Sequence, residues 1–383
     1  MHTILHLSLI ENIGPTFIQK LVEIIGLHAI SDVYRFSLHD FTRLGISEVR
    51  AQLLIDGLQD QALLQKELEL IESLNVSIIT FWCESYPDRL RHIDAAPPVL
   101  YLQGNASLLL QDKMLACVGA RLAHSYAQDC LNRIVVPMIC DGWIIVSGGA
   151  AGADTFAHKT ALQHGGKTIA VFGSGLCYQY PGKNKALFQE IIDSGGLIVS
   201  SFPMRTQPLQ HCFPIRNRIV SGLSVGCLVL QAAVKSGALI TAQYALDQGR
   251  EVFAVPGPIY DPLSAGCHEL VKLGAKLVTE TQDILDELMP NLRPTIKQEN
   301  FITNADLQSK QEKKSQKNIV ASSVNDSVDE VERLILQYAI IPISIDDLLI
   351  KVGVTASVLH DKLFMLSLDG KIEQDCTGLW KRK

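Results

Sequence analysis

The first feature of this chain that could do chemistry is a small-residue turn between an apolar run and a helical pattern. Residues 143–146 read Trp-Ile-Ile-Val, which indicates a buried strand of a parallel sheet. Ser147, Gly148 and Gly149 follow, and we expect a helix from about Asp154. Such a turn presents backbone N–H groups at a helix N-terminus, where a phosphate or carboxylate can bind. A tight turn with nothing bound would give the same pattern.

Further turns of this kind follow other predicted strands. Apolar runs alternate with helical patterns, which predicts an α/β fold with a doubly wound parallel sheet, whose ligands bind at the carboxyl ends of the strands. The other predicted strands are 114–118, 168–172, 197–199, 225–230 and 251–255, with helices over about 125–140, 185–193 and up to 248. The turns at strand ends are Gly119-Ala120-Arg121, Gly173-Ser174-Gly175 and Lys235-Ser236-Gly237. Together with the turn at residues 147–149, they predict a pocket on one edge of the sheet.

Two clusters of polar residues add candidate chemistry. Arg216, Asn217 and Arg218 come shortly after Phe213, which would suit a phosphate-binding fork with a stacking neighbour. The same arginines could equally form structural ion pairs on a loop. Asp154 and His158 are four residues apart, so they share a helix face and could do acid–base work. The simpler interpretation makes Asp154 a helix-capping residue and His158 a packed one.

Composition limits the classes of protein that this chain can belong to. Its 383 residues have a net charge of −6, which is weak evidence against a general nucleic-acid binder but compatible with a local basic pocket. The 9 cysteines include no C-x-x-C pair, so we expect reduced thiols and no metal site or cofactor. No signal peptide and no membrane-spanning run is evident, so we expect a cytoplasmic protein without membrane contact.

The pattern of helices, strands and polar stretches predicts four parts. Residues 1–80 form a small helical domain whose Gly14-Pro15 turn is similar to a helix-hairpin-helix or SAM-like module, although few basic residues flank it. Residues 81–289 form the Rossmann-like domain, and residues 290–327 are a polar, flexible linker. Residues 328–383 resemble a winged helix, which we expect to contact protein more than DNA because its recognition helix carries no arginine.

The turns, taken in order, resemble the bacterial DNA-processing protein A (DprA, also called Smf) family over about residues 86–280. The matching segments are Tyr86-Pro87, residues 118–121, 147–154 and 168–171, Tyr180-Pro181, and residues 213–218, 236–242 and 249–257. Departures from the family pattern are Ala151 for an arginine, Ser201 and Gln231 for glutamates, and His268 for an asparagine.

The resemblance implies an extended Rossmann domain that binds single-stranded DNA, forms a homodimer and loads the RecA recombinase during natural transformation. Its phosphate contacts would map to Arg121, the 147–149 turn, Arg216, Arg218 and Lys235, and no catalytic group is needed, so we do not expect an enzyme. The glycine turns also resemble those of phosphoribohydrolases that cleave nucleoside monophosphates, which is the main alternative. A protein adaptor with a vestigial pocket is a third possibility.

Overall fold

The computed structural model describes residues 1–289 and, beyond them, short stretches between 333 and 382. The chain divides into two compact units, Met1–Pro294 and Thr295–Lys383, which are described separately. The predicted linker at residues 290–327 lies outside the described residues. The predicted four-part division of the chain stays a prediction.

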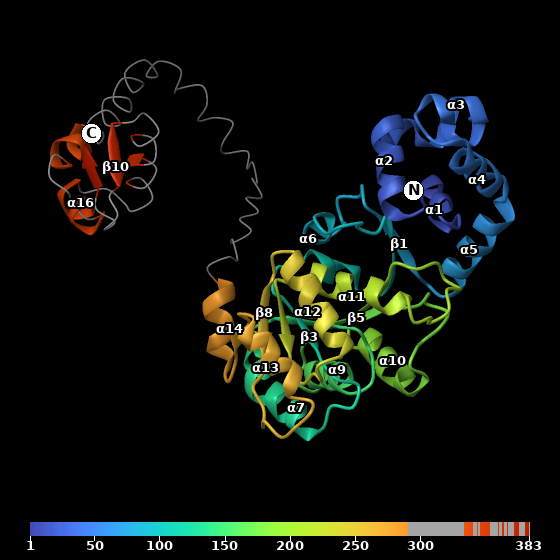
Figure 1. Cartoon of the computed structure of the whole chain (residues 1–383). Helices are drawn as coiled ribbons and strands as arrows, with labels where there is room; N and C mark the ends of the chain where they lie inside the picture. Colours follow the sequence, from blue (N-terminus) through green and yellow to red (C-terminus); the bar gives the residue numbers. More distant parts are fainter. Residues whose placement is uncertain are drawn as a thin grey trace, which may run out of the picture. The chain divides into compact units, whose positions relative to one another are not determined.

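A nine-stranded sheet forms the centre of the first unit (Figure 1). Its spatial order is β1-β2-β6-β5-β4-β3-β7-β8-β9, and every neighbouring pair from β6 to β9 is parallel. The strands are β1 (Ser77–Thr80), β2 (Val99–Gly104), β3 (Met114–Val118), β4 (Ile144–Ser147), β5 (Thr168–Phe172), β6 (Leu197–Ser200), β7 (Gly226–Val229), β8 (Glu251–Ala254) and β9 (Lys276–Leu277). The predicted α/β, Rossmann-like fold is therefore confirmed.

The prediction of a purely parallel sheet was wrong at one edge. β2 pairs antiparallel with β6, and β1 pairs antiparallel with β2, so the sheet is mixed. β1 and β2 precede the first crossover helix in the sequence. They can pair because antiparallel neighbours need no crossover connection.

Helices cover both faces of the sheet because both faces of each central strand are apolar. On one face, α11 (Cys212–Leu223), α12 (Gly237–Asp247) and α13 (Ala265–Lys272) pack on alternate residues of β3, β4, β5 and β7. The other face packs against the segment 125–140, α9 (Ala153–Gln163) and α14 (Thr281–Leu288), and towards β6 against α10 (Lys185–Asp193). The segment 125–140 is helical throughout, as predicted, and comprises α7 (Ser125–Cys130), a π-helical turn (Leu131–Val135) and α8 (Val136–Cys140).

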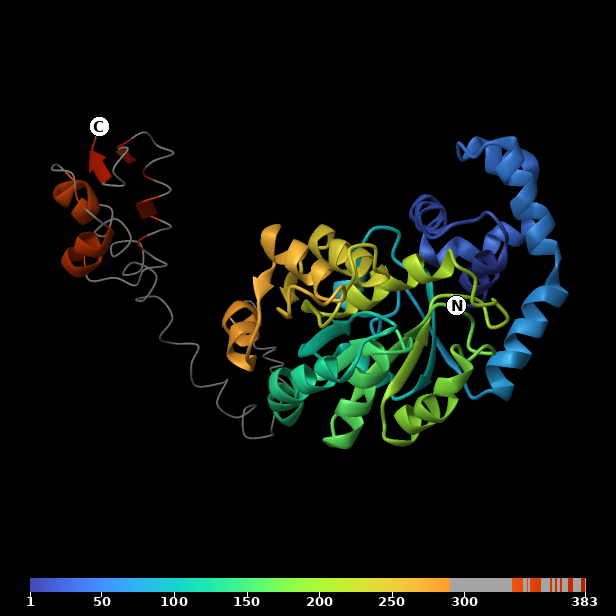
Figure 2. The same ribbon diagram turned by 60° about the horizontal axis from the view of Figure 1, so that its bottom comes forward.

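The N-terminal residues form a helical module beside the antiparallel edge of the sheet (Figure 2). Its helices are α1 (His2–Leu9), α2 (Pro15–Ile25), a 3-10 helix (Leu27–Arg35), α3 (Leu38–Arg43), α4 (Glu48–Gln59) and α5 (Gln61–Ser73). Apolar residues of this module share one core with β2, β5, β6 and α10. The Glu67 carboxylate also accepts a hydrogen bond from the backbone N–H of Met204 at 2.7 Å, so α5 is fixed to the loop after β6.

In the second unit, the described residues include helical and strand segments that pack around a small apolar core. α16 (Ile345–Val352) follows a short helical segment at 333–338, and β10 (Ile372–Gln374) pairs antiparallel with β11 (Trp380–Arg382). The sequence also indicates two short strands here, at residues 371–373 and 379–381, and both are present. Most of the expected recognition helix lies outside the described residues, so the winged-helix assignment stays a prediction.

Candidate functional site

A cleft of about 570 Å³ lies at the carboxyl ends of β3, β4 and β7. β3 has β4 on one side and β7 on the other, so the chain order reverses here and the loops after these strands diverge. Ligands of open α/β sheets bind at this kind of switch point. The predicted site residues that line the cleft are Arg121, Gly148, Arg216, Asn217, Lys235, Ser236 and Gly237. The structure therefore brings together parts of three of the four predicted turns.

The charge of the cleft is predominantly positive. Among the described lining residues, Arg121, Arg216 and Lys235 are cationic and Asp154 alone is acidic. Burial raises the pKa of the Asp154 carboxyl, although the Arg216 guanidinium opposes this shift. Arg121 and Lys235 are exposed; Arg121 lies on the loop after β3, and Lys235 lies on the loop after β7, the strand beside β3. A ligand that bridged the cleft would meet both cations.

Phe213 provides a flat apolar surface in the same cleft. The Arg121 guanidinium carbon lies 5.3 Å from the centre of the Phe213 ring, and that of Arg216 lies at 6.0 Å. The Tyr180 ring centre is 5.9 Å from that of Phe213. Phe213 was noted in the sequence only as a neighbour of the arginines, and the structure places it at the centre of the site. Its position before an Arg-x-Arg segment was the available signal.

Arg216 is a buried support of the cleft, with only 5% of its surface exposed. Its guanidinium donates to the backbone oxygens of Gly148 and Val171, the latter at 2.6 Å. A Cβ on Gly148 would lie 2.3 Å from the Arg216 Nη1 atom, so this turn needs glycine to let the guanidinium approach. Burial lowers the pKa of Arg216, and the carboxylate of Asp154 acts against that shift.

Hydrogen-bonding groups of the turn after β4 are paired with other groups of the chain. The backbone N–H of Ala150 donates to the Asp154 carboxylate at 3.1 Å, and the Ser147 hydroxyl donates to the Cys117 carbonyl at 2.6 Å. Ser147 and Gly149 are buried and do not line the cleft. Asp154 thus takes a place that a bound anion would take at a free helix N-terminus.

The turn after β5 contributes mainly through its close packing. Gly173 and Ser174 line a small pocket of about 50 Å³ that also includes Arg121, Ala151 and Phe213. A Cβ on Gly173 would lie 2.8 Å from the Phe213 ring, so glycine permits the ring to settle there. Gly175 lines neither cavity, and its N–H donates to the Thr206 carbonyl at 2.9 Å.

Asn217 joins two helices at the rim of the cleft. Its side-chain oxygen accepts from the Arg216 Nε at 3.0 Å, and its side-chain nitrogen donates to the Gly237 carbonyl at 3.3 Å. Ser236 caps α12 by accepting from the Ala238 N–H at 3.3 Å. Lys235 therefore lies immediately before a fixed helix start.

Arg218 is not part of this cleft. α11 is a helix, so residues two apart point about 200° away from each other, and Arg218 lies on a different side from Arg216. Its Nη1 donates to the Asp94 carbonyl at 2.9 Å, and it lines a separate cavity beside the N-terminal module. The two arginines that the sequence grouped as one fork are thus separated.

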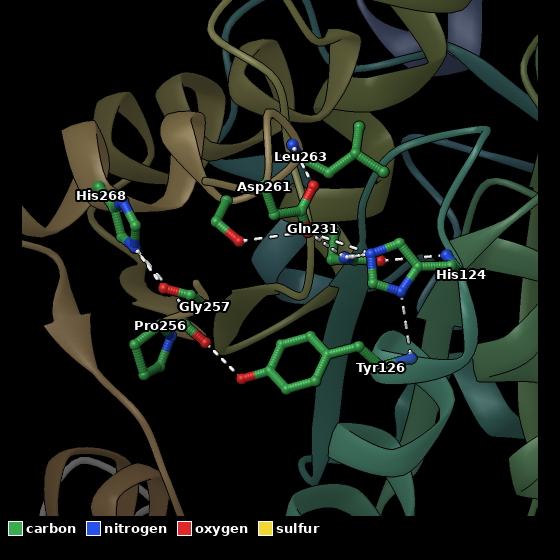
Figure 3. Close-up of polar contacts among 9 residues, drawn as sticks. His124, Tyr126, Gln231, Pro256, Gly257, Asp261, Leu263 and His268 are labelled. Atoms are coloured by element: carbon green, nitrogen blue, oxygen red, sulfur yellow. Dashed lines mark hydrogen bonds and ion pairs between the residues drawn. The ribbon is translucent and has the colours of Figure 1, made fainter. Parts of the chain in front are cut away.

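A polar network fixes the three loops that surround the cleft (Figure 3). His124 caps α7, because its Nδ1 accepts from the Tyr126 N–H at 3.3 Å. Its Nε2 lies 3.0 Å from the Asp261 carboxylate and 2.8 Å from the Gln231 side-chain nitrogen. Gln231 donates to the same carboxylate at 3.1 Å and accepts from the His124 backbone N–H at 3.1 Å. The Leu263 N–H, assisted by His124, lowers the pKa of Asp261.

The suggested acid–base pair is not assembled in the cleft. His158 is completely buried and does not line it. Its Nδ1 lies 2.7 Å from the Thr168 hydroxyl, and burial lowers its pKa to about 3. The Asp154 carboxylate bonds an N–H of the turn before α9 and does not cap the helix itself, whereas His158 is packed as the simpler interpretation has it.

Comparison with known proteins then identifies the family. Residues 77–289, more than half of the chain, match the model of DNA recombination-mediator protein A. The chain belongs to this family. The resemblance inferred from the turns is therefore confirmed.

Relatives and solved structures of the family extend the match. The chain is 43% identical over 228 residues to the DNA processing protein DprA of Streptococcus pneumoniae, covering 60% of this chain and 78% of that protein. It is 44% identical over 226 residues to protein Smf of Escherichia coli, covering 59% and 60%. The X-ray structure of the Streptococcus pneumoniae protein matches with a TM-score of 0.60 and 37% identity, over 72% of this chain and 98% of that one.

A second solved structure is that of DNA processing protein A from Helicobacter pylori, described for its single-stranded DNA binding mode. It matches with a TM-score of 0.51 and 29% identity, over 57% of this chain and 97% of that one. No described helix of the present chain is long and apolar enough to cross a membrane.

Proposed function

We propose that this chain binds single-stranded DNA in the cleft at the carboxyl ends of β3, β4 and β7. The observation that carries the proposal is that Phe213 lines the same cleft as two exposed cations, Arg121 and Lys235, with the Arg121 guanidinium over its ring. Side-chain cations suit the phosphate backbone, and an aromatic face suits an unstacked base of any identity. The single-stranded DNA binding of the Helicobacter pylori relative supports this choice of ligand.

The residues take different roles in this proposal. Arg121 and Lys235 contact phosphates, and a base stacks on Phe213. Arg216 positions the ring and the turn after β4, because its Nη1 donates to backbone oxygens and its Nε donates to Asn217. The turns at Gly148 and Gly173 act by leaving room for Arg216 and Phe213. Arg218 makes no contact with DNA in this arrangement.

Fluorescence anisotropy with a labelled oligonucleotide tests the DNA-binding proposal. We expect tight binding to the single strand, weaker binding to its duplex, and affinity that falls as salt rises. The double variant Arg121→Ala/Lys235→Ala should flatten the slope of log K against log salt by about 1.4, since each lost single-strand phosphate contact contributes about 0.7. Lys159→Ala, an exposed lysine on α9 outside the cleft, is the matched control. An unchanged slope in the double variant would contradict the assignment.

We further propose that the chain acts in the cytoplasm as a homodimer and loads RecA onto single-stranded DNA during natural transformation. Membership of a recombination-mediator family supports the recombination role. The lag before RecA nucleates on strand covered by single-strand binding protein should shorten when this protein is added. Sedimentation velocity measures the dimer. An unchanged lag with intact DNA binding would remove the RecA step and leave the DNA-binding proposal standing.

The phosphoribohydrolase alternative is not favoured. His158 is buried away from the cleft and Asp154 caps the turn, so neither group is available to move a proton at a substrate. Release of free base from nucleoside monophosphates by the purified protein, absent from an Asp154→Asn variant, would restore that alternative.

A further inference from the structure

A second cavity, of about 460 Å³, lies between the N-terminal helical module and the α/β core. Cavities of this size at the junction of two modules are common sites for small ligands. We call it the inter-module pocket. It is lined by Ser8, Ile13, Pro15 and Ile18 from the helical module and by Pro97, Pro98, Val99, Ser201, Phe202, Pro203, Ile215, Arg218 and Tyr244 from the α/β core.

The walls of the inter-module pocket are held in place by contacts outside it. The Gln19 side chain donates to the Ala96 carbonyl at 3.0 Å, which ties α2 to the segment before β2. The contact between Glu67 and Met204 ties α5 to the loop after β6, which also supplies Phe202 and Pro203. The two modules share an apolar core behind these contacts. The pocket is therefore preformed, so a ligand would not have to order its walls.

Arg218 is a partly buried cation, and no acidic residue among the described ones lines the pocket with it. Its donors reach only backbone oxygens, those of Asp94 at 2.9 Å and Ile215 at 3.3 Å. Within residues 1–289, no carboxylate forms an ion pair with it. Burial lowers the pKa of its guanidinium, although the charges of Tyr244, Tyr86 and Asp94 act against that shift. A partly buried cation whose hydrogen bonds go to carbonyl oxygens favours an anion at its remaining donors.

The remaining walls are apolar and carry ring-shaped side chains. Phe202 and Tyr244 supply aromatic surfaces, and four prolines line the pocket with them. Such walls favour a flat, ring-bearing body, while the planar guanidinium fork suits the two oxygens of a phosphate or carboxylate. Because the pocket is small, we do not expect it to hold a long polymer.

We propose that the inter-module pocket binds a small molecule that has an anionic head group on a flat ring system. The phosphate or carboxylate pairs with Arg218, and the ring lies against Phe202 and Tyr244. A nucleoside monophosphate has this chemistry, and so does an aromatic carboxylate. This site is distinct from the DNA cleft, since Arg218 lies on a different side of α11 from Arg216.

Isothermal titration of the full chain with thymidine 5′-monophosphate, thymidine and indole-3-acetate tests the proposal. We expect saturable binding of at least one anionic probe, and thymidine should bind at least tenfold more weakly than its monophosphate. Comparison of the two anionic probes shows whether phosphate or carboxylate is the preferred head group. No saturable binding of either anion would overturn the proposal.

Variants locate the binding site. Arg218→Gln should weaken the anionic probe at least tenfold, and Ser201→Glu should do the same because its carboxylate would pair with Arg218. Thermal unfolding of both variants verifies that they are folded. If one variant does not fold, the other still tests the proposal. The cleft variant Arg121→Ala/Lys235→Ala serves to exclude the DNA site. Loss of probe binding in the cleft variant, or full binding in Arg218→Gln, would refute the assignment independently of DNA binding.

Discussion

Acidification should destabilise this protein through His158, by an amount that the structure allows us to calculate. The Thr168 hydroxyl donates to the Ile145 carbonyl at 2.7 Å, so it must accept from the protonated Nδ1 of His158. The Nε2 of His158 is then an unprotonated nitrogen, buried without a hydrogen-bond partner among the described residues. Adding a proton there would create a charge in an apolar site, and burial, with the charge of Arg216, lowers the pKa to about 3.

The sign and size follow from proton linkage. An unfolded histidine has a pKa of about 6.5, so the unfolded chain takes up this proton as the pH falls while the folded chain does not. The contribution is constant above about pH 7 and is lost progressively down to the folded pKa of about 3. At pH 5, which is about 1.5 units below the unfolded pKa, the loss is about 2 kcal/mol at about 1.36 kcal/mol per unit.

Urea unfolding of the wild type and of His158→Gln at pH 8 and pH 5 measures this loss. Glutamine can donate to Thr168 but does not titrate, and other groups such as Asp154 titrate in both proteins. The difference in the free energy of unfolding between the two proteins should therefore shift by about 2 kcal/mol in favour of the variant at pH 5. An equal difference at both pH values would refute the buried, neutral histidine.

Three further substitutions probe the cleft and its supports. Phe213→Leu should weaken single-strand binding by about 1–3 kcal/mol in anisotropy without changing the salt slope, because stacking is lost and charge is not; a changed slope would contradict this role. Arg216→Met should cost about 1–3 kcal/mol in urea unfolding because it removes the donor to the buried Gly148 and Val171 carbonyls, and an unchanged free energy of unfolding would show that Arg216 is dispensable. Asp261→Asn should accelerate amide hydrogen exchange in the loops at 119–124 and 257–264, since the contact with His124 is weakened; unchanged exchange would mean that other contacts fix these loops.

The central strands could be predicted from the sequence because their environment is uniform. β3, β5 and β6 are buried on both faces, so each is a continuous apolar run followed by a helix. The antiparallel edge was not predicted, because β1 and β2 are separated by a segment without a hairpin turn. In such a case, pairing is decided by contacts that are distant in the sequence.

The location of the candidate site could be predicted from the sequence, but the contacts within it could not. Small turns after parallel strands indicate the edge where a cleft forms, and the cleft lies there. No helix was predicted over residues 212–223, which form α11, and the helical period separates Arg216 from Arg218. The glycines of two turns proved to make room for Arg216 and Phe213, and such packing has no signature in a single sequence.

The shared core between the helical module and the sheet sets a limit on how this protein can be divided for experiments. The family match begins at residue 77, which invites a shortened fragment starting there. Such a fragment would remove the N-terminal part of the apolar core to which the buried residues Tyr101, Phe188 and Ile198 belong. Newly exposed apolar surface beside an open strand edge promotes aggregation. Poor behaviour of that fragment would then reflect its missing partner helices rather than any weakness of the Rossmann-like domain.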